Sequence, residues 1–357
     1  MFFKLRILAV TAAGIVFVAC AGLYGFSAQV KPGPAAKAAT PTPTPPVITD
    51  DEVIKIDTEV VNVLFTAQDR NRRLLTNLRQ EDIRLTENGR VQELVAFSRQ
   101  VDLPLSLAIL IDTSVSQQRT LPEEKAAAIA FLETVMRPSK DEVSIISFTG
   151  ESTLEQGMTN NLARLRHAID RVKFMPPSGY IGGGVIAGTP PISGDNQMIQ
   201  GSTAIWDSVW VTADEVLGPA PERTRRAIIL LSDGVNTSGR KKLDDAVNAA
   251  LRSEAIIYSI GIGDNFYSGV DKGSLNKISE RTGGRAYFPR DERELRDAFR
   301  QIQEEMRSQY LIAYEPTDQR RDGSYRKIEI ELVNQALQKE KVKVTHRQGY
   351  FAKTGSK

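Results

Sequence analysis

Residues 105–116 read LSLAILIDTSVS, an apolar run that ends in an aspartate and two alternately spaced serines. Before Asp112, Ser106 is the one polar residue, and such a run is typical of a β-strand buried on both faces of a parallel sheet. Four more short apolar runs follow, and segments with helical spacing separate them. This alternation predicts an α/β fold with a doubly wound, mainly parallel sheet. The five expected strands are residues 105–111, 143–148, 227–231, 255–262 and 286–288.

Helix-start signals and amphipathic spacing place helices between these strands. Thr120 and Glu123 have the spacing of a capping box, and Pro122 suits the first turn of a helix. Asp291 and Glu294 have a similar spacing before the last helix, whose apolar residues recur on one face. The expected helices are residues 121–136, 162–172, 205–216, 243–251, 275–281 and 291–306.

The segments on either side of the α/β pattern have β signatures. Val53–Ala67 is rich in Val, Ile and Thr, and Asn88-Gly89 between two alternating apolar runs, 81–86 and 91–97, predicts a hairpin. After Arg307, residues 310–314, 325–332 and 341–345 have strand patterns. Because so few strands are not stable alone, we expect the two groups to pair and form an accessory β module.

The N-terminal residues are predicted to be a targeting segment. Lys4 and Arg6 precede the apolar run 7–26, which is about 20 residues long and so is long enough to span a bilayer. A cleaved secretory signal, an uncleaved membrane anchor and a lipoprotein modified at Cys20 all remain open. Each alternative exports the rest of the chain, which would be periplasmic, secreted or anchored to the membrane by this segment. The Pro-, Ala- and Thr-rich residues 31–48 are typical of an extended spacer or a disordered tail.

These patterns together predict the domain organisation. We expect a signal peptide or anchor, a linker, an N-terminal β block, an α/β domain, C-terminal strands that pair with the N-terminal block, and a short tail. The corresponding ranges are 1–28, 29–49, 50–100, 101–308, 309–351 and 352–357.

Composition excludes several kinds of partner and site. The chain has 46 Lys and Arg against 44 Asp and Glu, a net charge of +2, which argues against a nucleic-acid binder. We expect membrane contact only through the N-terminal segment. Cys20 is the single cysteine, so the chain can form neither an internal disulfide nor a cysteine-based zinc site. With only His167 and His346, a histidine metal cluster is not expected.

Oxygen-bearing side chains follow the apolar strands. In open α/β sheets, ligands bind beyond the carboxyl ends of the strands, so side chains there are expected to meet. All of these donors are hard oxygens, which suit Mg²⁺, or alternatively Mn²⁺ or Ca²⁺, better than zinc or copper. Two carboxylates balance a divalent ion, and hydroxyls add no charge. Taken alone, the first motif is equally typical of helix capping. The segments that carry these oxygen atoms are residues 112–116, 201–203 and 232–234, which together offer two carboxylates and several hydroxyls.

The sequence resembles the von Willebrand factor A-type domain family over about residues 101–307. Residues 110–116, LIDTSVS, are similar to the first segment of that family's metal-ion-dependent adhesion site, Thr203 in GSTAIWD to its threonine loop, and Asp233 in LSDG to its second aspartate. The flanking β segments look like a bacterial subgroup. The resemblance implies a Rossmann-like fold, a Mg²⁺-type ion and binding of a protein partner through its Asp or Glu side chain. The metal ligands that it implies are Asp112, Ser114, Ser116, Thr203 and Asp233. The Gly- and Pro-rich segment Ser178–Gln200 departs from the pattern, which leaves the partner's identity open.

The sequence lacks the motifs of several enzyme classes. An aspartyl phosphatase needs Asp-x-Asp after its first strand, but Ser114 stands at the second position and cannot act as an acid or base near neutral pH. The Gly-x-Ser-x-Gly arrangement of a serine hydrolase is missing, and Gly261-Ile262-Gly263 lacks the third glycine of a dinucleotide loop. We therefore expect a binding protein without catalytic residues. The alternatives are a structural envelope protein with a stabilising metal site and a metal-dependent hydrolase.

Overall fold

The computed structural model describes residues 60–100, 103–174, 180–181, 184–185, 202–221, 224–263 and 269–355. The chain divides into Met1–Lys55 and Ile56–Lys357, and every described residue belongs to the second unit. The expected targeting segment, the linker, the start of the first predicted strand and most of the 178–200 loop lie outside the described residues. Within the described ranges, no helix has the length and apolar character needed to cross a membrane.

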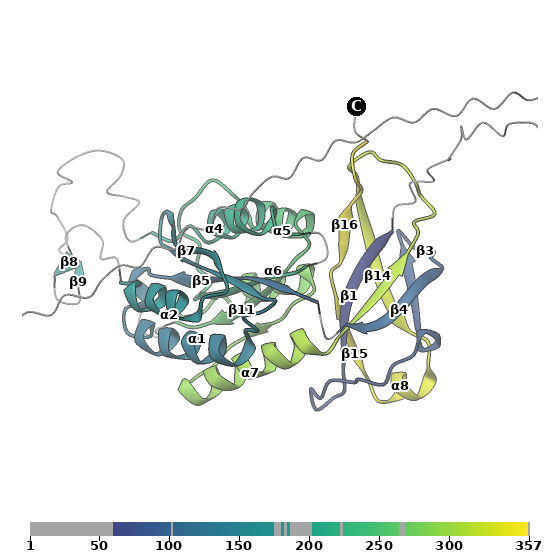
Figure 1. Ribbon diagram of the computed structural model, residues 1–357, viewed down its shortest axis with the longest axis horizontal. Coiled ribbons are helices and arrows are strands. Elements are labelled where there is room, and N and C mark those ends of the chain that lie inside the picture. The colour runs from purple at the N-terminus through teal and green to yellow at the C-terminus, as the bar shows by residue number, and fades with distance from the viewer. Residues whose placement is uncertain are drawn as a thin grey trace, which may run out of the picture. The chain divides into compact units, whose positions relative to one another are not determined.

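A six-stranded sheet forms the centre of the larger domain (Figure 1). Its strand order is β12-β11-β10-β5-β6-β7, and every neighbouring pair is parallel except β6 with β7. The predicted mainly parallel sheet is therefore confirmed. Its strands are β5 (Leu105–Asp112), β6 (Glu142–Phe148), β7 (Ser152–Thr159), β10 (Arg225–Ser232), β11 (Ala255–Gly261) and β12 (Ala286–Tyr287).

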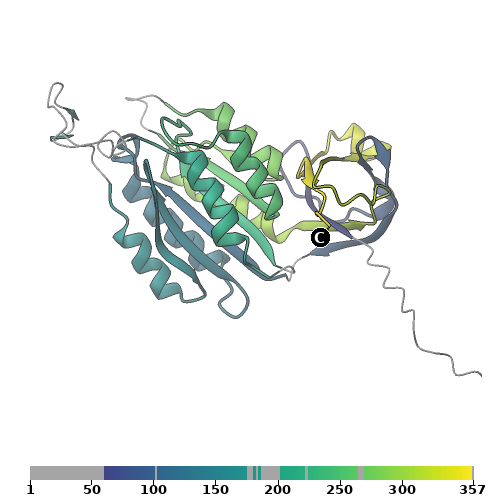
Figure 2. The same cartoon turned by 90° about the horizontal axis from the view of Figure 1, so that it is seen from above.

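Helices cover both faces of this sheet (Figures 1 and 2). One hydrophobic cluster joins α1, α2 and α7 to one face, and a second joins α4, α5 and α6 to the other. This arrangement is the doubly wound, Rossmann-like fold that the sequence predicted. The helices are α1 (Leu121–Val135), α2 (Leu162–Arg171), α4 (Ile205–Val211), continued by a π-helical turn at Thr212–Leu217, α5 (Leu243–Arg252), α6 (Lys272–Thr282) and α7 (Glu292–Arg307).

The two central strands bring polar residues to one edge of the sheet. All eight residues of β5 and all eight of β10 are buried, and the strands pair in parallel with Leu110 beside Leu230. Burying each large aliphatic side chain contributes about 1.5–3 kcal/mol, so this register is strongly favoured. Because the register is parallel, Asp112 at the end of β5 and Ser232 at the end of β10 lie at the same edge.

Strands from the two ends of the described chain form the accessory β module (Figure 1). Its two sheets have the orders β15-β1-β13-β4 and β16-β14-β2-β3, and all pairs are antiparallel. Phe65 stacks on Tyr310 in the core between them. Pairing of β1 with β13 and of β2 with β14 confirms the expected module. Its elements are β1 (Val61–Gln68), β2 (Ile83–Glu87), β3 (Arg90–Val91), β4 (Leu94–Gln100), β13 (Gln309–Tyr314), β14 (Tyr325–Leu332), α8 (Gln335–Lys339), β15 (Lys343–His346) and β16 (Gly349–Phe351).

The predicted hairpin forms, but its second strand differs from the expectation. Asn88 and Gly89 both have positive φ, 47° and 78°, as a two-residue hairpin turn requires. The expected strand 91–97 is instead divided between β3 and β4, which belong to different sheets. The chain changes sheets at Gln92, whose buried side chain bonds to the Thr317 hydroxyl and backbone N–H.

Two further expectations are corrected. The capping box at Thr120 does not form, because the Thr120 hydroxyl donates to the backbone and side-chain oxygens of Gln117 and makes no cap bond to the helix. The edge strand β7 was not predicted, since its sequence STLEQGMT lacks apolar alternation. Within the long loop, only the two short strands β8 (Tyr180–Ile181) and β9 (Gly184–Val185) are described.

Candidate metal centre

Asp112 is the buried carboxylate at the centre of the candidate site. It ends β5 and has no exposed surface. The Ser114 backbone N–H donates to Asp112 Oδ1 at 2.9 Å, and the Ser232 hydroxyl donates to Oδ2 at 2.6 Å. These two bonds fix the carboxylate between the ends of β5 and β10.

The two predicted serines lie together in the turn after β5. A short 3₁₀ turn, Val115–Gln117, follows Ser114 and brings the Ser114 and Ser116 hydroxyl oxygens to 3.1 Å from each other. The Gln117 side-chain amide donates to Ser116 Oγ at 3.4 Å and to the Ile262 carbonyl at 3.0 Å. The turn is therefore held against the end of β11.

Asp233 follows β10 directly and is also buried. The Val235 N–H donates to its Oδ1 at 2.9 Å. Burial raises the pKa of Asp233, while a hydrogen bond from the Ser116 hydroxyl opposes that rise. Asp233 therefore lies close to the serine turn.

Thr203 lies on the loop before α4, at the same edge of the sheet. Its N–H donates to the Thr237 hydroxyl at 2.8 Å, and its carbonyl accepts from the N–H groups of Thr237 and Ser238. The next residue, Ala204, donates to the carbonyl of Thr149, just after β6, while Thr113 donates to that of Phe148, the last residue of β6. The Thr203 loop and the Asp112 turn are therefore anchored on adjacent carbonyls.

The loop after Asp233 is positioned by one side chain of α4. Asp207 accepts from the N–H groups of Arg240 and Lys241 at 3.1 and 3.0 Å. The backbone of Gly239 packs against this carboxylate, since a Cβ there would be 2.1 Å from Asp207 Oδ2. Its φ of +101° is also in a region that residues with a Cβ rarely adopt. Glycine is required at this position for both reasons.

The site has an excess of buried negative charge. In the described part of the chain, neither Asp112 nor Asp233 forms an ion pair with a basic side chain. Burial, reinforced by the nearby Asp233 charge, raises the pKa of Asp112 to about 7. Glu124 on α1 is buried too, and burial raises its pKa to about 8, so it is mostly neutral at pH 7.

This donor set fits a hard divalent cation. Two carboxylates without a counter-charge and nearby hydroxyls are the ligand chemistry of Mg²⁺ or Mn²⁺. No cluster of three or more His, Cys, Asp or Glu that could hold a metal occurs among the described residues.

Most of the predicted set is brought together. Asp112, Ser114, Ser116 and Asp233 are joined by the contacts above, and Thr203 lies on a loop at the same edge; their role as metal ligands stays a prediction. Sequence reasoning missed Ser232, Gln117 and Glu124, which orient or surround the predicted ligands. Only Ser232 carried a signal, since it directly precedes Asp233 at the end of an apolar strand.

Part of the larger domain matches one family model. The family model "von Willebrand factor type A domain" matches residues 193–301, a range that includes Thr203 and Asp233 and begins after the Asp112 segment. Among solved structures, the conserved hypothetical protein BatB from Bacteroides thetaiotaomicron is 18% identical, with 57% of this chain and 100% of that chain covered and a TM-score of 0.43. Proximal thread matrix protein 1 from the mussel byssus, with a zinc-occupied MIDAS motif, is 20% identical, with 61% and 49% covered and a TM-score of 0.43. No curated protein matches the chain.

Proposed function

We propose that this chain, which contains a von Willebrand factor type A domain, is an exported binding protein of the cell envelope. It binds a partner protein through a divalent cation that coordinates an Asp or Glu side chain of that partner.

The observation that carries this proposal is the pair of buried carboxylates at the ends of two adjacent parallel strands. Asp112 and Asp233 are both nearly inaccessible, and no basic side chain of the described chain neutralises them. Burying unpaired charge is costly, so such a pair is expected only where a cation completes it.

Five side chains would hold the ion, which is Mg²⁺ or alternatively Mn²⁺ or Ca²⁺. When bound, the ion supplies a Lewis-acidic position that an outside carboxylate can occupy. The hydroxyls carry no charge, so the two aspartates alone balance the charge of the divalent ion. The Ser232 hydroxyl and the Ser114 N–H hold the Asp112 carboxylate in place. The proposed ligands are Asp112, Ser114, Ser116, Thr203 and Asp233.

A purely stabilising metal site is less well supported. Hydrogen bonds of the chain itself join the three loops: Ser232 bonds to Asp112, Thr203 to Thr237, and Ala204 to the Thr149 carbonyl just after β6. A metal is therefore not needed to connect them, whereas the uncompensated charge still requires one.

We also propose that the chain is not an enzyme. Ser114 occupies the position where an acid or base would stand in an aspartyl phosphatase. His167 is exposed on α2, and His346 ends β15 in the other module, so neither accompanies Asp112.

Export is proposed from the N-terminal sequence. Lys4 and Arg6 before the apolar run 7–26 are typical of a secretory signal or anchor. A fusion of residues 1–50 to alkaline phosphatase, which is active only after export, tests this; an inactive fusion that stays in the cytoplasm would refute it.

Metal-dependent capture tests the binding function. The described domain is immobilised, and proteins retained from an envelope extract are compared in Mg²⁺ and in chelator. We expect a partner that is retained only with Mg²⁺ and is lost with Asp112→Ala. The control, Asp170→Ala, changes an exposed aspartate on α2 and should leave capture intact.

The partner's acidic residue is then tested directly. Replacing its contacting Asp or Glu by the corresponding amide should reduce affinity as strongly as chelator does. Capture that persists in chelator would refute the mechanism. A Mg²⁺-dependent rise in melting temperature without any metal-dependent partner would favour the stabilising site instead.

A further inference from the structure

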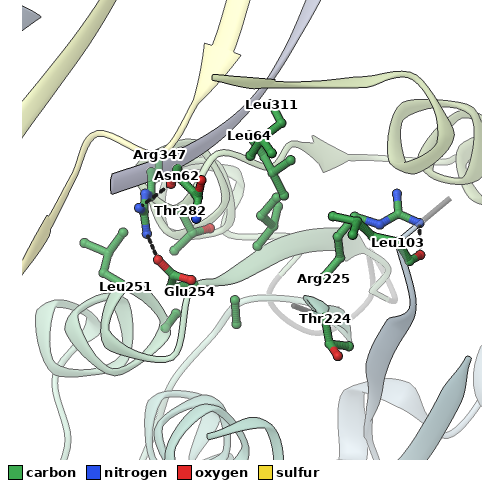
Figure 3. Close-up of a pocket in the computed structure, with 13 residues that line it drawn as sticks. Asn62, Leu64, Leu103, Thr224, Arg225, Leu251, Glu254, Thr282, Leu311 and Arg347 are labelled. Atoms are coloured by element: carbon green, nitrogen blue, oxygen red, sulfur yellow. Dashed lines mark hydrogen bonds and ion pairs between the residues drawn. The ribbon is translucent and has the colours of Figure 1, made fainter. Parts of the chain in front are cut away.

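A cavity of about 350 Å³ lies between the β module and the larger domain, away from the candidate metal centre (Figure 3). Arg225, which lines it, begins β10, whereas Ser232 at the metal edge ends that strand. A strand of this length spans roughly 25 Å. The cavity is therefore a separate feature at the amino-terminal end of the sheet.

Both modules contribute apolar walls. Leu64 of β1 and Leu311 of β13 line the cavity from the β module, and Leu251 and Ile256 line it from the larger domain. Its volume is within the range of small-molecule sites and too small for a folded partner. A ligand here would need an apolar body of modest size.

Arg225 carries an uncompensated positive charge at this cavity. The residue is only 7% exposed. Its guanidinium donates to the backbone carbonyls of Met306 and Leu103, and its Nε–H has no partner. No carboxylate of the described chain forms an ion pair with it, and the carboxylate that acts on it electrostatically, Asp141, is already paired with Arg137 at 2.8 Å. The Met306 carbonyl belongs to the last turn of α7, whose dipole offsets about half a charge, so a net positive charge remains.

The other arginine of the cavity is already paired. Arg347 donates to Glu254 Oε1 at 3.1 Å and to the Asn62 carbonyl at 2.6 Å. Figure 3 shows this pair on one side of the cavity and Arg225 with Leu103 on the other. The charged side chains of the lining, Arg225, Arg347 and Glu254, therefore sum to one positive charge.

We propose that this cavity binds a small monoanion with a carboxylate head and an apolar body of medium-chain fatty-acid size. The carboxylate supplies the counter-charge that Arg225 lacks, because buried charges are normally paired. The apolar body packs against the leucine and isoleucine side chains contributed by both modules. The ligand thus stabilises the junction between the modules.

Octanoate is the probe, and thermal unfolding of the exported chain is the first measurement. All samples contain chelator and the Asp112→Ala substitution, so that a carboxylate cannot act at the metal centre. We expect a saturable rise in melting temperature, on the order of 4 °C at a hundredfold excess over Kd. Octanol, which has the chain without the charge, and acetate, which has the charge without the chain, should each give less than a quarter of this rise.

Variants locate the binding. Leu311→Trp fills the cavity from the β module and should abolish octanoate binding by calorimetry. Val95→Trp, on an exposed position of β4, should retain it. Leu64→Trp provides a second filling variant should the first fail to fold. Arg225→Met should weaken octanoate at least tenfold and leave any octanol binding unchanged. Any one of three results would overturn the proposal. These are equal effects of octanol and octanoate, octanoate binding that persists in both filling variants, and no binding of octanoate at millimolar concentration.

Discussion

Gly239→Ala tests how the loop after Asp233 is held. Gly239 has φ +101°, and a Cβ there would lie 2.1 Å from Asp207 Oδ2 and 3.0 Å from Cγ. The new methyl group would displace the carboxylate that accepts the N–H groups of Arg240 and Lys241. The substitution therefore combines backbone strain with the loss of two hydrogen bonds.

The expected cost follows from these two contributions. A non-glycine residue in the left-handed region costs about 1–2 kcal/mol. Two bonds to a carboxylate in a partly exposed loop contribute roughly 1 kcal/mol each. We expect the free energy of unfolding to fall by about 2–4 kcal/mol.

Urea unfolding of a double-mutant cycle separates the two contributions. In an Asp207→Ala background, Gly239→Ala should cost only the backbone part, about 1–2 kcal/mol. Gly157→Ala is the control, because a Cβ there meets nothing nearer than 4.0 Å. Equal costs in the two backgrounds would show that Asp207 does not limit the space at Gly239. Mg²⁺ affinity should fall with Gly239→Ala as well, since the same loop bonds to the Thr203 carbonyl.

Three further predictions concern buried titratable groups. Burial raises the pKa of Glu124 to about 8, above its value in the unfolded chain. The wild-type protein should therefore lose stability as the pH rises from 4.5 to 8. Glu124→Gln should remove this pH dependence, which urea unfolding across that range measures. Burial lowers the pKa of His346, so the folded state should lose stability as the pH falls below 6.5. If the melting temperatures of the wild type and of His346→Gln fall by the same amount between pH 7.5 and 5, this prediction is contradicted. Asp141 is buried, accepts from Arg137 and from the Leu105 N–H, and has a lowered pKa, so its contribution is present above pH 3.8 and lost below. Asp141→Asn should destabilise the fold by about 2–4 kcal/mol at pH 7, and calorimetry showing no change would refute that role.

The parts of the fold that sequence predicted are those where one physical signal dominates. The strands β5 and β10 are buried along their whole length, so continuous apolar runs were sufficient to identify them. No residue of the edge strand β7 is fully buried, so burial imposes little alternation on its sequence, and its pairing with β6 is set by tertiary context. Likewise, the division of the expected 91–97 strand depends on Gln92 meeting Thr317, more than 200 residues later, which no local pattern encodes.

The same distinction applies to the candidate site. Parallel strands place their carboxyl ends at one edge of the sheet. The sequence alone was therefore sufficient to predict that aspartates directly after two apolar runs would meet. The charge state of that edge could not be predicted from the sequence. The pKa of Asp112 depends on its complete burial and on the charge of Asp233, which lies 121 positions later in the chain. Glu124 gave no signal either: on a helix it resembles any surface glutamate, and only the packing of α1 buries it. Topology therefore determines which of the predicted ligands meet, whereas packing determines how much uncompensated charge they carry. We expect a chain with the same motif on a more exposed edge to bind a cation more weakly.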